Sequence, residues 1–186
     1  MLAPPPSKDK KAKTQAGTFI FKASYRDRGS QTQSPLEGGE AIAMRPAFQQ
    51  AEQADSMSKN IRTYRPFNGD TVVLNDLKSN TFFLFKHVDL TGVHSIAMGL
   101  GMSDRRYSFG GGRVEIRLSS PKGTLLGKAV VPRKDPGAKM EFMELNVPLQ
   151  TPAGGAFHDV YFVLKNENDP SKPVAAVDWV RFDLRN

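Results

Sequence analysis

A carboxylate stands at the head of an apolar row near the end of the chain. In an extended strand over residues 174–184, Val180, Phe182 and Leu184 share one face, and Asp178 opens that row. Burying an unpaired carboxylate is costly, so Asp178 needs an arginine, water at the rim of the domain, or a metal ion. The only tryptophan, Trp179, follows on the opposite face, where we expect it to pack.

Residue types exclude several other kinds of chemistry. The chain has no cysteine, which rules out disulfides, thiolate metal sites and cysteine nucleophiles. The three histidines, His87, His94 and His158, lack metal-ligand spacing such as HExxH. No GxSxG motif is present, and no pair of acidic residues is singled out for acid–base catalysis. We therefore expect a chain that is not an enzyme.

Charge and hydropathy limit the partners. The formal net charge is +7, but basic residues are interspersed, without a basic helix or an aromatic RNA-binding signature. We expect a solvated surface and no nucleic-acid partner. Binding of an acidic polysaccharide through the positive charge is an alternative, and such binding would weaken as salt increases. No apolar run approaches the ~20 residues of a membrane span, so we expect no membrane partner. The opening MLAPPPSKDKKAK is not followed by the apolar region of a signal peptide.

The pattern of elements predicts an all-β chain. Residues 1–16 are rich in proline, lysine and alanine and indicate a disordered tail or linker. Residues 17–46 hold two strand-like runs, TFIFKASYRD and AIAMRP, which predict a hairpin extension. Residues 47–186 alternate short strands with turns, which favours a β-sandwich or barrel. The strands are expected at 48–53, 71–75, 81–86, 93–100, 113–119, 124–131, 141–147, 157–165 and 175–184.

Four sequence runs resemble family 6 carbohydrate-binding modules. The most specific is GGRVEIRLSSPKGTLLGKAVVP at residues 111–132, which resembles a strand–turn–strand of that family. QAEQAD (50–55), AFHDVYFVLKN (156–166) and VAAVDWVRFDL (174–184) resemble other family motifs in the same order. The resemblance implies a jelly-roll β-sandwich over residues 47–186 that binds sugar without catalysis.

The resemblance also implies a setting for the chain. Such modules are appended to larger secreted enzymes, and residues 17–46 resemble the run that often precedes a module in large exported bacterial proteins. The hairpin is then an extension of the module or a remnant of an upstream domain. The implied partners are a polysaccharide or oligosaccharide and other domains of a larger parent protein. The implied location is extracellular or periplasmic.

A structural calcium ion is part of what the resemblance implies. Glu52 matches the glutamate of the family's opening strand, Gln50 matches a position that is often acidic, and Asp178 matches the aspartate of the closing strand. Calcium takes 6–8 oxygen ligands, including carboxylates, amides and backbone carbonyls. Pairing of Asp178 with an arginine, or its exposure at the rim, is the alternative.

The usual sugar site of the family is degenerate in this sequence. The family's stacking tryptophan aligns near Lys139 or Met140, and its sugar-contacting asparagine aligns with Ala176. Three alternatives follow: binding on the concave sheet face, a rebuilt loop site, or a structural β-sandwich that docks on a neighbouring domain and binds no sugar. The candidates for a loop site are Tyr64, Phe67, Tyr107 and Phe109, with Asn166 and Asn168. The run SFGGG (108–112) beside them has the composition of a flexible turn.

Overall fold

The computed structural model of the 186-residue chain describes residues 19–66, 71–103, 107–137, 141–150 and 157–184. The expected tail over residues 1–16 lies outside these ranges. The chain divides into two compact units, Met1–Pro46 and Ala47–Asn186. Within the described ranges, no helix is long and apolar enough to cross a membrane.

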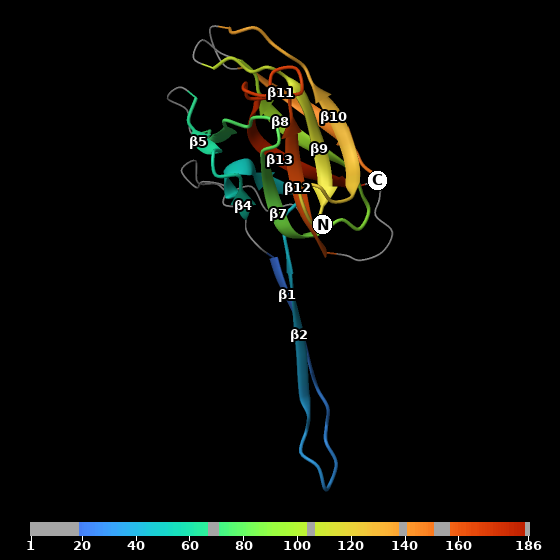
Figure 1. Cartoon of the computed structure of the whole chain (residues 1–186). Coiled ribbons are helices and arrows are strands. Elements are labelled where there is room, and N and C mark those ends of the chain that lie inside the picture. The colour runs from blue at the N-terminus through green and yellow to red at the C-terminus, as the bar shows by residue number, and fades with distance from the viewer. Residues whose placement is uncertain (1–18, 67–70, 104–106, 138–140, 151–156, 185–186) are drawn as a thin grey trace. The chain divides into compact units, whose positions relative to one another are not determined.

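The first unit is an antiparallel hairpin. Strand β1 (Phe19–Arg26) pairs with β2 (Glu37–Met44) along its whole length (Figure 1, blue). Asp27 organises the connecting loop, because its Oδ1 accepts hydrogen bonds from the amides of Gly29 (2.8 Å) and Leu36 (2.9 Å). The predicted two-stranded extension is therefore confirmed. Its second strand begins at Glu37, earlier than AIAMRP indicates, because the two glycines at 38 and 39 pair with Tyr25 and Ser24.

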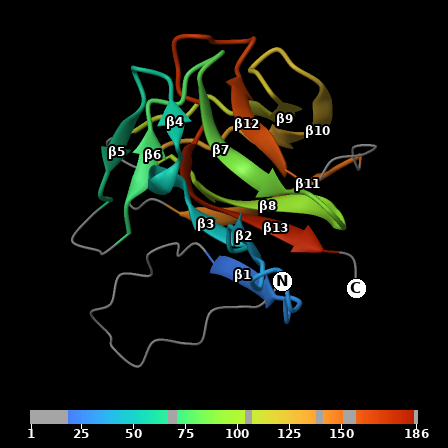
Figure 2. The same cartoon turned by 90° about the horizontal axis from the view of Figure 1, so that it is seen from below.

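The second unit is a sandwich of two antiparallel sheets (Figures 1 and 2). One sheet has the order β10-β9-β12-β7-β4, and the other has the order β11-β8-β13-β6-β5, with β3 paired to β13. The strands are β3 (Phe48–Gln50), β4 (Ser56–Met57), β5 (Arg62–Tyr64), β6 (Val73–Asn75), β7 (Phe82–Asp89), β8 (Val93–Gly101), β9 (Gly112–Leu118), β10 (Leu125–Val131), β11 (Phe142–Pro148), β12 (Phe157–Lys165) and β13 (Ala176–Leu184). A single turn of 3-10 helix, η1 (Ala51–Gln53), follows β3. The all-β sandwich predicted from the sequence is confirmed.

Alternating side chains of the two sheets fill the core between them. From one sheet, Phe83 of β7 stacks on Phe162 of β12 with ring centroids 4.7 Å apart. From the other sheet, Phe182 of β13 meets Phe162 edge-on at 6.5 Å. Each of these rings is at most 3% exposed, and burial of one such side chain stabilises a domain by roughly 1.5–3 kcal/mol. This core fixes the strand ends from which the loops at one end of the sandwich project.

Candidate functional site

Three of the predicted aromatic residues come together in one cluster. Tyr64 ends β5, while Tyr107 and Phe109 lie in the connection from β8 to β9. The rings of Tyr64 and Tyr107 meet edge to face, with centroids 4.7 Å apart. The rings of Tyr107 and Phe109 are nearly parallel at 6.4 Å. Both tyrosines are half-buried, so this pair presents aromatic surface at the loops.

Phe109 packs against the tyrosine pair, and its ring has no exposed face on which a ligand could stack. Its side chain is 1% exposed and packs with Val73 and Ala176 beneath the tyrosine pair. A buried ring cannot stack on a ligand, so the role suggested for Phe109 as a contact residue is not what the structure favours. Ala176 is fully buried in the same cluster and contributes no polar group. Phe67, Lys139 and Met140 lie outside the described residues.

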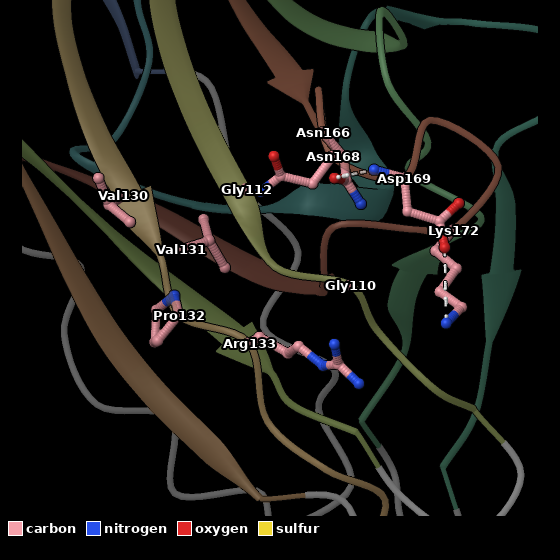
Figure 3. A pocket seen from close by; sticks show the side chains of 10 residues that line it. All are labelled: Gly110, Gly112, Val130, Val131, Pro132, Arg133, Asn166, Asn168, Asp169 and Lys172. Carbon is pink, nitrogen blue, oxygen red and sulfur yellow. Dashed lines mark hydrogen bonds and ion pairs between the residues drawn. The ribbon is translucent and has the colours of Figure 1, made fainter.

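The two predicted asparagines lie next to this cluster, in a separate pocket. Asn166 and Asn168 belong to the connection from β12 to β13, and both line a pocket of about 480 Å³ (Figure 3). Gly110, which directly follows Phe109, also lines it, whereas neither tyrosine is among its described lining residues. The loop candidates therefore form two neighbouring groups, and not one site.

The pocket contains charged residues that sequence reasoning missed. Its lining comprises Gly110, Gly112, Val130, Val131, Pro132, Arg133, Asn166, Asn168, Asp169 and Lys172. The sequence marks residues 133–139 and 166–173 as turns, but gives no sign that the two turns meet. Only the pairing of β9 with both β10 and β12 brings Arg133 close to Asn166. The signal in the sequence that pointed to this pocket was that both turns contain charged residues.

The three predicted metal ligands do come together. Gln50 of β3 pairs with Trp179 of β13, so it stands beside Asp178 in the sheet. Glu52 lies two residues further along, in η1, and its Oε2 atom is buried. Burial first, and the charge of Glu52 second, raise the pKa of Asp178 to about 6. The two carboxylates thus lie within electrostatic reach of each other.

Asp178 occupies a bulge that strict alternation did not predict. The register of β13 against β8 shifts between Val177 and Trp179, so Asp178 is the extra residue. Val180 and Phe182 are buried as expected, but Leu184, past a second register shift, is 37% exposed. The residues that β13 contributes to the main core are therefore Val177, Val180 and Phe182, and Asp178 is not among them.

Oxygen atoms other than carboxylates are needed to complete a metal site here. Among the described residues, no group of three or more acidic, histidine or cysteine side chains gathers in one place. Two carboxylates and the Gln50 amide are hard oxygen donors of the kind that calcium prefers, and a full calcium shell would need further oxygens, such as backbone carbonyls or water. The donor set fits calcium and does not fit a soft metal ion.

Trp179 packs as predicted. Its ring lies on Gly99 of β8, where an added Cβ would come within 2.4 Å of the indole Nε1. The ring of Phe48 in β3 contacts the indole ring of Trp179, with centroids 5.3 Å apart. The Arg181 guanidinium lies 5.5 Å from the centroid of the same indole ring. The tryptophan therefore ties β3, β8 and β13 together on the outer face of the sheet.

The solvent side of the five-stranded sheet carries an aromatic pair and an ion network. Phe82 and Tyr161 have ring centroids 5.4 Å apart. Beside them, Glu115 accepts hydrogen bonds from Arg113 (2.8 Å) and Arg117 (2.9 Å). Burial opposes ionisation of Glu115, but the hydrogen bonds and the positive charges of the two arginines together outweigh it and hold the pKa of Glu115 below its usual value. The charged groups on this face bind one another, which leaves it less suited to a sugar than the loop end.

Comparisons with known proteins agree on one family. The sequence model described as carbohydrate binding module (family 6) matches residues 48–184. A β-1,3-glucan-binding CBM6 from Bacillus halodurans is 28% identical, with a TM-score of 0.58 over 74% of this chain and 95% of that chain. No curated protein has a significantly similar sequence.

Two further solved structures share the fold. A module from Clostridium stercorarium, in complex with cellobiose, is 21% identical, with a TM-score of 0.59 over 75% of this chain and 95% of that one. A family 6 module from Clostridium cellulolyticum, in complex with xylose, is 22% identical, with a TM-score of 0.60 over 74% of this chain and 97% of that one. At these identities the likeness concerns the fold alone.

Proposed function

Because the chain belongs to family 6 of the carbohydrate-binding modules, we propose that residues 47–186 bind a polysaccharide or oligosaccharide through Tyr64 and Tyr107. The observation that carries this proposal is the half-buried tyrosine pair, held at the loop end by buried Phe109. Aromatic rings bury large apolar areas while a phenol hydroxyl stays available for hydrogen bonds. The apolar face of a pyranose ring has the matching chemistry.

The geometry of the pair limits how a sugar binds. The two rings touch edge to face, with centroids 4.7 Å apart, so a pyranose does not fit between them. The sugar instead stacks on the outward face of one ring, and hydroxyl groups of the ligand reach the polar atoms nearby. With a buried alanine at position 176, the polar contacts come from other residues. The proposed site is thus a rebuilt form of the degenerate loop site.

Affinity electrophoresis over a panel of neutral polysaccharides tests this proposal. Tyr107→Ala and Tyr64→Ala should each weaken binding by about tenfold, which corresponds to about 1.4 kcal/mol. Tyr161→Ala is the matched control, because it removes a half-buried tyrosine from the solvent side of the five-stranded sheet. Loss of binding in Tyr161→Ala alone would move the site to the sheet face and contradict the proposal.

A calcium ion bound by Glu52, Asp178 and Gln50 is the second part of the proposal. The buried Oε2 of Glu52 and the raised pKa of Asp178 support it, because two neighbouring carboxylates disfavour each other's ionisation without a cation. Calcium would supply positive charge that neutralises both groups. Its ligands would come from β3 (Gln50), η1 (Glu52) and β13 (Asp178), so the ion would link the first and last strands of the sandwich.

We further propose that the chain serves as a non-catalytic accessory module of a larger exported protein that is extracellular or periplasmic. Membership of the family supports this, because its modules are binding domains typical of secreted proteins. Fractionation of cells that express the full-length protein would test the location. Recovery of the protein in the cytoplasm would contradict it.

Docking on a neighbouring domain is the competing function. The hairpin favours it, since Ile20, Phe21 and Tyr25 of β1 are each more than half exposed. If the wild-type chain binds no glycan in the panel, docking becomes the better account.

A further inference from the structure

The pocket beside the tyrosine cluster has more hydrogen-bond donors than its own acceptors use. Arg133 projects from the end of β10 toward the loop that carries Asp169 and Lys172 (Figure 3). The Arg133 side chain is 72% exposed and contacts Asp135 only at 3.8 Å. Exposed ion pairs of this kind contribute little to stability, so the guanidinium can exchange Asp135 for a ligand at small cost.

A buried amide adds a fixed donor to the same pocket. Asn166 is 1% exposed; its Oδ1 accepts a hydrogen bond from the Asp169 amide (3.0 Å), and its backbone N–H donates to Ser79 Oγ (3.0 Å). Its Nδ2 is buried and has no hydrogen-bond partner among the described residues. Figure 3 shows this nitrogen directed toward the space between Gly110 and Lys172. A buried donor without a partner costs free energy that a ligand can recover.

Among the described lining residues, the one acidic side chain, that of Asp169, already has partners. Asp169 accepts a hydrogen bond from Ser171 Oγ (2.6 Å) and lies 3.5 Å from Lys172 Nζ. The ammonium of Lys172 has three donors and uses one of them here. Arg133 and Lys172 against Asp169 leave the described lining with one net positive charge. An acceptor-rich anion therefore complements this pocket better than a neutral hydroxyl does.

We propose that this pocket binds the carboxylate of a uronic acid unit in the glycan, with Arg133 and Lys172 as cationic contacts and Asn166 Nδ2 as the buried donor. A guanidinium matches the two oxygens of a carboxylate in geometry as well as charge. This inference rests on the proposed function, because the tyrosine pair next to the pocket holds the neighbouring sugar. It assigns acidic glycans as the preferred ligand class.

Matched ligands give the sharpest test. Glucuronoxylan and the same polymer with its carboxyl groups reduced to alcohols differ only in the group that the pocket is proposed to bind. Isothermal titration calorimetry of the full chain should show at least fivefold tighter binding of the acidic form at low salt. The preference should shrink at high salt, because exposed cations are screened.

Substitutions in the pocket test whether the preference for the acidic polymer arises there. Arg133→Gln and Lys172→Gln should each remove most of the acidic preference and leave binding of the reduced polymer unchanged. Lys122→Gln is the control, because it makes the same charge change in the exposed turn at the opposite end of the β9–β10 pair. Tyr107→Ala should instead weaken binding of both polymers.

The possible outcomes separate the two proposals. Equal affinity of wild-type protein for both polymers overturns the acidic pocket and leaves the tyrosine site standing. An acidic preference that survives Arg133→Gln and Lys172→Gln, or that Lys122→Gln also removes, overturns it as well. Acidic binding that depends on Arg133 but not on Tyr107 supports the pocket and contradicts the tyrosine site.

Discussion

Asp178 is an acidic group whose charge the surrounding protein stabilises poorly. Burial and the neighbouring carboxylate raise the pKa of Asp178 to about 6, from an ordinary value of 3.8. Unfolding releases Asp178 from both effects. Folding stability must therefore depend on pH wherever the folded and unfolded forms of Asp178 differ in protonation.

The sign of this dependence makes the calcium proposal testable. In the presence of chelator, the melting temperature should fall as pH rises from about 4 to about 6, because the unfolded carboxyl ionises first and the folded one only at a cost. Calcium added at pH 7 should raise the melting temperature by several degrees, because an increase of 1 kcal/mol in the free energy of unfolding raises it by roughly 2–4 °C. Asp178→Asn should remove both effects, and thermal unfolding followed by circular dichroism measures them.

Asp135→Asn is the control for this experiment, because the Asp135 side chain is 88% exposed. If wild-type protein and Asp178→Asn show the same pH slope, and calcium changes neither melting temperature, the calcium proposal is wrong.

At the scale of elements, the glycine run at 110–112 is packed and not a flexible turn. An added Cβ at Gly111 would lie 2.6 Å from the Arg133 amide nitrogen, and one at Gly112 would lie 2.1 Å from the Lys165 carbonyl. Gly112 also has a φ of +137°, a backbone angle that residues with a side chain rarely adopt. The run lets β9 approach both β10 and β12, and so brings the walls of the pocket together.

Gly112→Ala should therefore destabilise the sandwich by roughly 2–4 kcal/mol, because it combines backbone strain with a clash against main chain. Urea unfolding measures the change. Gly38→Ala is the matched control, since nothing lies within 4 Å of the added Cβ in the hairpin. A Gly112→Ala protein as stable as wild type would show that this segment is not held as described.

Most of the fold was predictable from the sequence, because strand faces follow from local alternation. Phe83 and Phe162 point inward as the pattern of their strands indicates. Several features were not predictable, including the short strands β4 and β5, which no predicted strand covers. The 3-10 turn at Ala51–Gln53 replaces the end of a predicted strand, the bulge at Asp178 depends on pairing with β8, and β2 extends back to Glu37 through its register with β1. Each depends on partners distant in sequence.

The candidate site, like the fold, was predictable from the sequence only in part. Tyr64 and Tyr107 could be proposed from their residue types and positions in loops, and so could the acidic pair. The sequence could not show that Phe109 is buried or that Asn166 belongs to a pocket with Arg133, because these depend on how three connections meet.

At the scale of the whole molecule, the two proposed binding surfaces lie at one end of the sandwich. The tyrosine pair offers apolar rings, and the adjoining pocket offers cationic and amide donors. Such a combination suits an extended ligand that has both sugar faces and charged substituents. A rigid core holds both surfaces, so little ordering is required when the ligand binds.

Chemical-shift mapping by NMR, with a neutral oligosaccharide titrated into the isotope-labelled chain, tests the central claim most directly. The account predicts that the largest shifts occur at Tyr64, at Tyr107 and in residues 108–112. Shifts concentrated on the solvent side of the five-stranded sheet, at Phe82, Arg117 and Tyr161, would contradict it.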